Sequence, residues 1–208
     1  MVSDQSSFVC AFNTERNQTE RFRSYEDPDG KTSRDDTSIL DVALAASAAT
    51  TFFHEARIHN GDEYVDAALG TNNPVFEVAN EMKRIWNLDN DRAQEKTKCF
   101  LSIETGAGSV KVPKGGLHSL LVSLAQFSTE TEKTAERFQD VWEDVALDGH
   151  YLRLNVGHEV GDIKLFEYKR LDEIRKLTED YIKTQRVPIA NIVEILSRRT
   201  RARPPAKV

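Results

Sequence analysis

Short apolar runs and amphipathic stretches alternate along the chain, and this pattern predicts strands separated by helices. The continuous apolar run Phe8–Phe12 is typical of a strand buried on both faces, and Lys98–Ile103 has the same character. Tyr151–Val156 alternates apolar and polar residues, which indicates a third strand, and Phe22–Tyr25 is a candidate for a fourth. Strands separated by helices favour an α/β layered fold.

Helices are predicted from cap residues and from apolar positions at helical spacing. Thr37 or Ser38 can cap a short helix through Ile39 and Ala46. In Asn72-Asn73-Pro74, Asn73 is expected to cap a helix that begins at Pro74 and continues through Val75, Val78, Ala79, Met82 and Trp86. Two further helices are expected at about 171–185 and 188–199.

A long amphipathic region follows from about Leu117 to Val145, and Asp148-Gly149 is a predicted turn. The candidate core positions of the amphipathic region are Leu120, Leu121, Leu124, Phe127, Ala135, Phe138 and Trp142.

Composition restricts the classes of partner. The chain has 208 residues, enough for one domain with a sizeable core, and a net charge of −6. This acidic balance argues against a nucleic-acid partner, which needs a basic face. The basic stretch from Arg198 to Lys207 is expected to be a solvated terminus, with a weak contact to an anionic membrane as the alternative.

Cysteine usage and the absence of long apolar runs point to a cytoplasmic protein. Cys10 and Cys99 are widely spaced, as expected of free thiols in a reducing compartment. No signal-peptide pattern begins the sequence, and no run reaches the roughly 18 apolar residues that span a bilayer.

Several common catalytic patterns are missing. No serine in the 208 residues has glycine at both −2 and +2, so the chain contains no Gly-x-Ser-x-Gly nucleophile turn. Gly106-Ala107-Gly108 lacks the third glycine of a dinucleotide-binding loop, because position 111 is Lys111. The five histidines show no metal-ligand spacing. We therefore expect neither a metal ion nor an organic cofactor.

Three segments in order resemble the patatin-like phospholipases. Ala45–Phe53 (AASAATTFF) is similar to the family's Ala-Thr-Ser-Ala-Ala-Pro-Thr-Tyr-Phe segment, and Tyr64–Pro74 (YVDAALGTNNP) to its Asp-Gly-Gly or Asp-Gly-Ala element running into Asn-Asn-Pro. Phe100–Gly106 (FLSIETG) resembles its Leu-Ser-Ile-Gly-Thr-Gly strand end. Thr129–Ala135 and the strand from Tyr151 resemble the downstream part of such domains in multidomain fungal proteins, so that the resemblance extends to about Tyr181.

The resemblance implies a function. The family hydrolyses acyl esters of lipids with a serine nucleophile that an aspartate alone activates, and Asp66 occupies the position of this catalytic base. A turn aspartate bonded to its own backbone is the structural alternative for Asp66. Asn72 and Asn73 are expected to organise the turn and the helix cap and not to contact substrate.

The sequence also departs from the family. Ala67 and Glu104 replace glycines, and an alanine costs about 1 kcal/mol or more in a left-handed conformation. The family's glycine-rich oxyanion loop and nucleophile serine lie N-terminal to every matched segment. We therefore expect this chain alone to hydrolyse no lipid ester, since the oxyanion hole usually supplies the largest electrostatic contribution.

The resemblance implies an incomplete patatin-like layered α/β/α fold: residues 1–170 would form the C-terminal half of the domain, and 171–208 C-terminal helices and a basic, disordered tail. Missing central strands would expose an apolar sheet edge. A partner protein that supplies the strands, self-association through the edge, or truncation of a longer sequence would each account for this, and truncation is favoured. The partners implied are a phospholipid or other acyl lipid and, transiently, a membrane surface. The alternative function is a degenerate, non-catalytic patatin-like interaction module.

Overall fold

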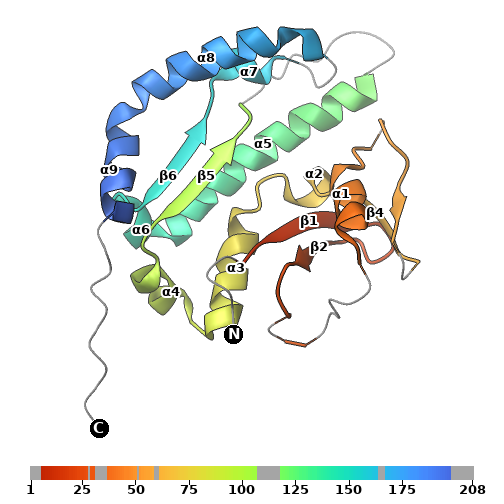
Figure 1. Cartoon of the computed structure of the whole chain (residues 1–208), viewed down its shortest axis with the longest axis horizontal. Helices are drawn as coiled ribbons and strands as arrows, with labels where there is room; N and C mark the ends of the chain where they lie inside the picture. The colour runs from red at the N-terminus through yellow and green to blue at the C-terminus, as the bar shows by residue number, and fades with distance from the viewer. Residues whose placement is uncertain are drawn as a thin grey trace. The chain divides into compact units, whose positions relative to one another are not determined.

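The structure is a computed structural model that describes residues 6–27, 29–30, 37–50, 52–58, 61–106, 118–163 and 167–197, with the backbone alone for 118–129 and 158. The chain forms two compact units (Figure 1). The first unit comprises Met1–Leu88 and Lys111–Phe138, and the second comprises Asp89–Val110 and Gln139–Val208. The predicted coarse class is confirmed, because both units combine helices with small sheets.

The first unit is built on a four-stranded antiparallel sheet with the strand order β2-β1-β4-β3. The bounds of the strands are β1 Phe8–Asn13, β2 Gln18–Arg23, β3 Ala56–Arg57 and β4 Glu63–Asp66. The β1–β2 turn is held by the buried side chain of Asn13, whose Oδ1 accepts hydrogen bonds from the backbone N–H groups of Glu15 (3.0 Å) and Arg16 (2.9 Å).

Helix α1 (Ile39–Ser47) packs against β1 and β4. Its start is the predicted one, since Ser38 and Asp41 form a reciprocal capping box. The small residues that follow permit close packing, because Ala45 and Ala48 are buried. The core of the sheet consists of Ala11, Ala45, Ile58 and Tyr64, with Phe22 and Ala56 packed against them.

After β4 the chain enters the short helix α2 (Ala68–Thr71) and then α3 (Val75–Trp86). Helix α3 ends where Asn87 adopts a left-handed conformation, with φ of 48°. The long helix α5 (His118–Val141) contributes Phe138 to the first unit, where its ring packs edge-on against Phe76 at 5.4 Å between centroids.

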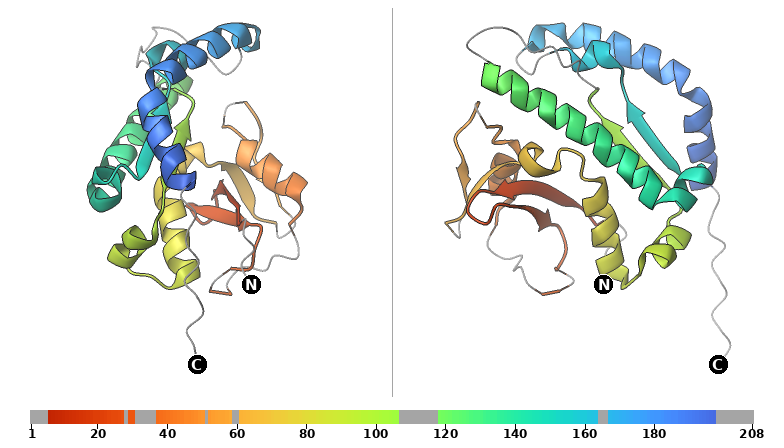
Figure 2. Two further views of the ribbon diagram at one scale, coloured as in Figure 1. Left: turned by 60° about the vertical axis from the view of Figure 1, so that its left-hand side comes forward. Right: turned by 180° about the vertical axis from the view of Figure 1, so that it is seen from behind.

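The second unit contains a two-stranded parallel sheet of β5 (Phe100–Glu104) and β6 (Tyr151–Asn155), seen side by side in Figure 1. Its helices are α4 Asn90–Lys96, α6 Glu143–Leu147, α7 His158–Gly161, the 3₁₀ turn η1 Tyr168–Arg170, α8 Leu171–Thr184 and α9 Arg186–Ser197. Helices α8 and α9 follow one another along β6 (Figure 2), and Ile192 of α9 is buried. The core includes Trp142, whose ring lies 5.8 Å from that of Phe100.

Two expectations about burial were wrong. Val9 is 45% exposed in β1, and in β5 Leu101 and Ile103 are 45% and 71% exposed. Neither strand is buried on both faces along its whole length. In β1 the exposed Val9 lies on the same face as the buried Ala11, and within the described residues β5 pairs with β6 alone. A continuous apolar run therefore did not indicate burial on both faces here.

The predicted positions of the helices agree better with the structure, but the burial of residues in α3 differs from the prediction. The two C-terminal helices lie where they were predicted. In α3, however, the buried residues are Val75, Ala79 and Glu81, whereas Val78 and Trp86 are 41% and 58% exposed. Of the predicted core of the amphipathic region, Ala135, Phe138 and Trp142 are buried, and Leu120, Leu121, Leu124 and Phe127 have side chains outside the described part.

Within the described residues, no helix has both the length and the apolar character needed to cross a membrane.

Candidate functional site

Asp66 is the last residue of β4, at the point where the strand turns into α2. It lies opposite Ala11 of β1, and its N–H donates to the carbonyl oxygen of Ala48 (3.0 Å). Its side chain is half-buried, and Oδ1 accepts a hydrogen bond from the backbone N–H of Ala68 (2.9 Å). The carboxylate is therefore held in one orientation by the turn that follows it, in the manner of the aspartate turn that was the structural alternative.

Ala67 occupies this turn without backbone strain. Its φ of −60° and ψ of −15° lie in the right-handed helical region, which every L-residue adopts. The left-handed conformation, in which alanine would be costly, is not used here. Ala67 is therefore compatible with a well-formed turn at Asp66.

Asp66 lines a cavity of about 500 Å³ in the first unit. Apolar residues from β1, α1 and the α2–α3 region form most of its wall, and hydroxyl, amide and carboxylate groups lie among them. The lining residues are Ser6, Ser7, Phe8, Val9, Cys10, Ala46, Asp66, Ala67, Ala68, Thr71, Asn72, Pro74 and Val78. The hollow is open to solvent, and its wall is more apolar than polar, so that Asp66 borders a partly apolar surface depression.

The two asparagines after α2 have different environments. Asn73 is buried, and its Oδ1 accepts from the backbone N–H of Val75 at 3.2 Å in the turn before α3. The N-cap of α3 is Pro74, one residue later than the predicted cap Asn73. Asn72 is exposed at the cavity and donates from Nδ2 to Oγ1 of Thr131 on α5 at 2.7 Å. Both asparagines thus organise the chain around the cavity.

Cys10 also lines the cavity, as a thiol of low reactivity. Burial and the negative charge of Glu77 raise its pKa from 9.0 to about 11. Because the thiolate is the nucleophilic form, Cys10 is almost entirely in its unreactive form at neutral pH.

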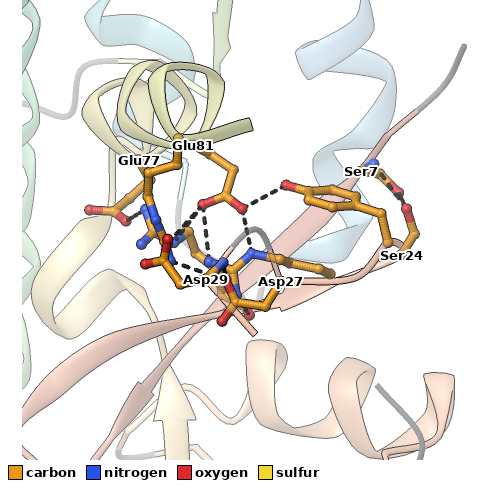
Figure 3. A network of polar contacts seen from close by, with 10 residues as sticks. Ser7, Ser24, Asp27, Asp29, Glu77 and Glu81 are labelled. Atoms are coloured by element: carbon orange, nitrogen blue, oxygen red, sulfur yellow. Dashed lines mark hydrogen bonds and ion pairs between the residues drawn. The ribbon is translucent and has the colours of Figure 1, made fainter. Parts of the chain in front are cut away.

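A set of charged and polar side chains around Glu81, which we call the Glu81 cluster, connects α3 to β2 and to the segment that follows β2 (Figure 3). Glu81 is 2% exposed, and its carboxylate accepts from both Nε and Nη2 of Arg23, the second contact at 3.0 Å. The hydroxyl of Tyr25 donates to the same carboxylate at 3.0 Å, and Nε of Arg21 lies 3.2 Å from it. Nη1 of Arg84 is 3.4 Å away.

Opposing effects act on the ionisation of Glu81. Burial by itself raises the pKa, but the hydrogen bonds from Arg23 and Tyr25 and the charges of Arg23 and Arg21 outweigh it and lower the pKa below its usual value. The sequence analysis did not identify this cluster. A detectable signal was the acidic residue Glu81 within a helix that has apolar residues at positions 75, 78, 79 and 82.

In the second unit, Glu104 is the last residue of β5. Its carboxylate binds the guanidinium group of Arg153 on β6 through two contacts, of 2.7 and 2.6 Å. Gly106 follows with φ of +109°, and its N–H donates to Oδ1 of Asn155 at 2.9 Å. Glu104 is therefore neutralised by an ion pair, and the sharp turn that requires glycine lies at Gly106.

In the part of the chain that the structure describes, no group of three or more His, Cys, Asp or Glu side chains is arranged to hold a metal ion.

No family model matches the sequence, and no curated protein matches it either.

Proposed function

We propose that this chain is part of a patatin-like lipid acyl hydrolase in which Asp66 is the base of a Ser–Asp dyad and the serine comes from outside these 208 residues. The observation that carries the proposal is the position of Asp66, which ends a strand, is held by the N–H of Ala68 and lines a largely apolar cavity of about 500 Å³. On this proposal, residues 1–170 belong to a patatin-like layered α/β/α domain, followed by the C-terminal helices.

The proposed reaction is acyl transfer in two steps. The carboxylate of Asp66 accepts the proton of the serine hydroxyl as the serine oxygen attacks the ester carbonyl, and Asp66 then passes this proton to the departing lipid alcohol. A water molecule then gives a proton to Asp66 as it attacks the acyl-serine, and Asp66 returns this proton to the serine oxygen as the fatty acid leaves. The apolar walls of the cavity, formed in part by Phe8, Val9 and Val78, suit an acyl chain.

The first measurement is the 5′ end of the transcript, read through the codon for Met1. An in-frame Gly-x-Ser-x-Gly upstream would make a longer protein available for assay. In that protein, Asp66→Asn should lower phospholipid turnover by at least a hundredfold, since the amide keeps the shape and cannot accept the proton. Glu130→Gln, on the exposed part of α5, is the control and should leave turnover unchanged.

The 208-residue chain should show no turnover of phospholipid vesicles above the rate without protein. Turnover by this chain that Asp66→Asn abolishes would contradict the requirement for an external serine. An upstream Gly-x-Ser-x-Gly protein whose turnover is insensitive to Asp66→Asn would contradict the assignment of the base.

A second candidate function is a degenerate, non-catalytic patatin-like interaction module. Its support is that Asp66 already accepts a hydrogen bond from its own turn and that Glu104, at a glycine position of the family, is bound to Arg153. The two candidates differ in a simple way: the module requires no in-frame serine motif, whereas the hydrolase does.

We also propose a reducing compartment, such as the cytoplasm. Cys10 and Cys99 are both free thiols, and burial raises the pKa of each of them.

A further inference from the structure

The outer edge of β5 has backbone groups without a neighbouring strand. The N–H of Phe100 donates to the carbonyl oxygen of His150 at 2.7 Å, so that the backbone of Phe100 faces β6. Backbone groups alternate in direction along a strand, and those of Leu101 and Ile103 therefore point away from β6. Within the described residues, β6 is the one strand that pairs with β5.

The side chains at the same two positions are apolar and exposed. Leu101 and Ile103 are 45% and 71% exposed, and their partners in register on β6 are Leu152 and Leu154. Leu152 is buried. On this face of the sheet, the apolar side chain of Leu152 on β6 is therefore buried, whereas those of Leu101 and Ile103 on β5 are exposed to solvent.

The other sheet edges in the described structure are protected. β2 carries Glu20, Arg21 and Arg23, and β3 has only two residues. On the far side of β6, the N–H of Asn155 donates to the hydroxyl of Tyr181 on α8 at 3.1 Å. Charge, shortness and a covering helix are the usual protections of an edge, and among the residues that the structure describes none of them protects β5 at Leu101 and Ile103.

We propose that the edge of β5 binds the same edge of a second copy of this chain, with the two strands antiparallel and Ser102 on the two-fold axis. In this register Leu101 faces Ile103 of the second copy, and Ile103 faces its Leu101. These are the residues whose backbone groups point outward, so each such pair exchanges two hydrogen bonds. The strand is therefore complementary to itself in both hydrogen bonding and apolar contact, which is the reason for choosing a second copy as the occupant.

Charge does not oppose this arrangement. The register places Glu104 opposite Phe100 of the second copy, and the carboxylate of Glu104 is already paired with Arg153. The result is a continuous four-stranded sheet in the order β6-β5-β5-β6, with the exposed leucine and isoleucine side chains packed across the two-fold axis.

Sedimentation equilibrium of the whole chain at roughly 5 to 200 µM tests the association. The chain should be dimeric in this range, and Ile103→Lys should weaken the dimer at least tenfold. Leu101→Pro should do the same, because it removes an outward N–H and leaves the bonds to β6 in place. Leu147→Lys is the matched control, since Leu147 is 75% exposed on α6, and it should leave the dimer unchanged.

Circular dichroism establishes that each variant is folded. A chain that is monomeric at all concentrations would overturn the proposal, as would a dimer that resists both edge substitutions.

A cross-link tests the register. With Cys10 and Cys99 replaced by alanine, Ser102→Cys should form a covalent dimer on mild oxidation, because the Cα atoms of a non-hydrogen-bonded pair lie about 4.5 Å apart, within disulfide reach. Leu101→Cys in the same background should not, since its counterpart lies two residues further along the strand. Cross-linking by Leu101→Cys and not by Ser102→Cys would overturn the register.

Discussion

The buried carboxylate of Glu81 on α3 is bound through both of its oxygens by the guanidinium group of Arg23 on β2, 58 residues earlier in the chain. This pair fastens a helix to an edge strand of the first unit (Figure 3). Arg21, Tyr25 and Arg84 also contact the carboxylate, so that its removal would weaken several contacts at once, although Arg21 keeps its ion pair with Glu77 and Arg84 its ion pair with Asp27.

Glu81→Gln should therefore destabilise the chain substantially. Breaking a buried ion pair by removing one partner typically costs about 3–5 kcal/mol, and glutamine, which retains one acceptor oxygen, should cost about 2–4 kcal/mol. Urea unfolding followed by circular dichroism measures the free energy of unfolding. Glu130→Gln, which removes an exposed pair with Lys133, should cost less than about 0.5 kcal/mol. Equal effects of the two substitutions would contradict the burial of the cluster.

The same carboxylate predicts a dependence of stability on pH. Because the folded pKa of Glu81 lies below its usual value near 4.5, the unfolded state binds the proton more tightly than the folded state. The stabilisation is thus complete above the unfolded pKa and is lost as the pH falls through the folded pKa. The difference in unfolding free energy between the wild-type chain and Glu81→Gln should be constant from pH 8 to about pH 5.5 and should shrink below about pH 4.5. A difference that grows on acidification would show the opposite sign of the shift.

The sequence predicted those elements whose signals are local. Ser38 and Asp41 form the cap that their spacing indicated, and Asn73 precedes α3 as expected. The Asp66 turn was also located, but the cavity beside it was not. The cavity is formed by β1, α1 and the chain from β4 to α3, which become neighbours only on folding.

The failures have the same physical origin. The run around Leu101 and Ile103 has the apolar character of a buried strand, yet its burial depends on whether another strand lies beside it, and no local pattern contains that information. Glu81 is buried because Arg21 and Arg23 alternate along one face of β2 and reach a helix more than fifty residues away. Ion pairs between residues so far apart in the sequence produce no local sequence pattern from which they could be predicted.

Gly106→Ala should destabilise the second unit. The backbone of Gly106 has φ of +109°, and a Cβ at this position would lie 2.9 Å from the backbone nitrogen of Gly161. Strained backbone and a clash with another backbone segment together should cost roughly 2–4 kcal/mol. Gly157→Ala is the control, because a Cβ there meets no atom within 4 Å, and it should change stability by less than about 1 kcal/mol.

The fluorescence of Trp142 measures the unfolding of the second unit in the Gly106→Ala and Gly157→Ala variants. The chain has two tryptophans, and replacement of the exposed Trp86 by phenylalanine leaves the buried Trp142 as the single fluorophore of its kind. If Gly106→Ala were no more destabilising than Gly157→Ala, the tight approach of Gly106 to Gly161 would be refuted.

The cavity beside Asp66 can be probed through the thiol of Cys10. In a Cys99→Ser variant, Cys10 is the single thiol, and burial together with the charge of Glu77 raises its pKa from 9.0 to about 11. At pH 8 the folded chain should thus contain about 100-fold less thiolate at this position than an unfolded chain. Alkylation by iodoacetamide should be at least tenfold slower in the native state than in urea, and mass spectrometry of the modified fraction gives both rates. The native rate should rise with pH up to the highest pH at which the chain stays folded. Equal rates in the native and unfolded states at pH 8 would contradict the burial of the Cys10 thiol.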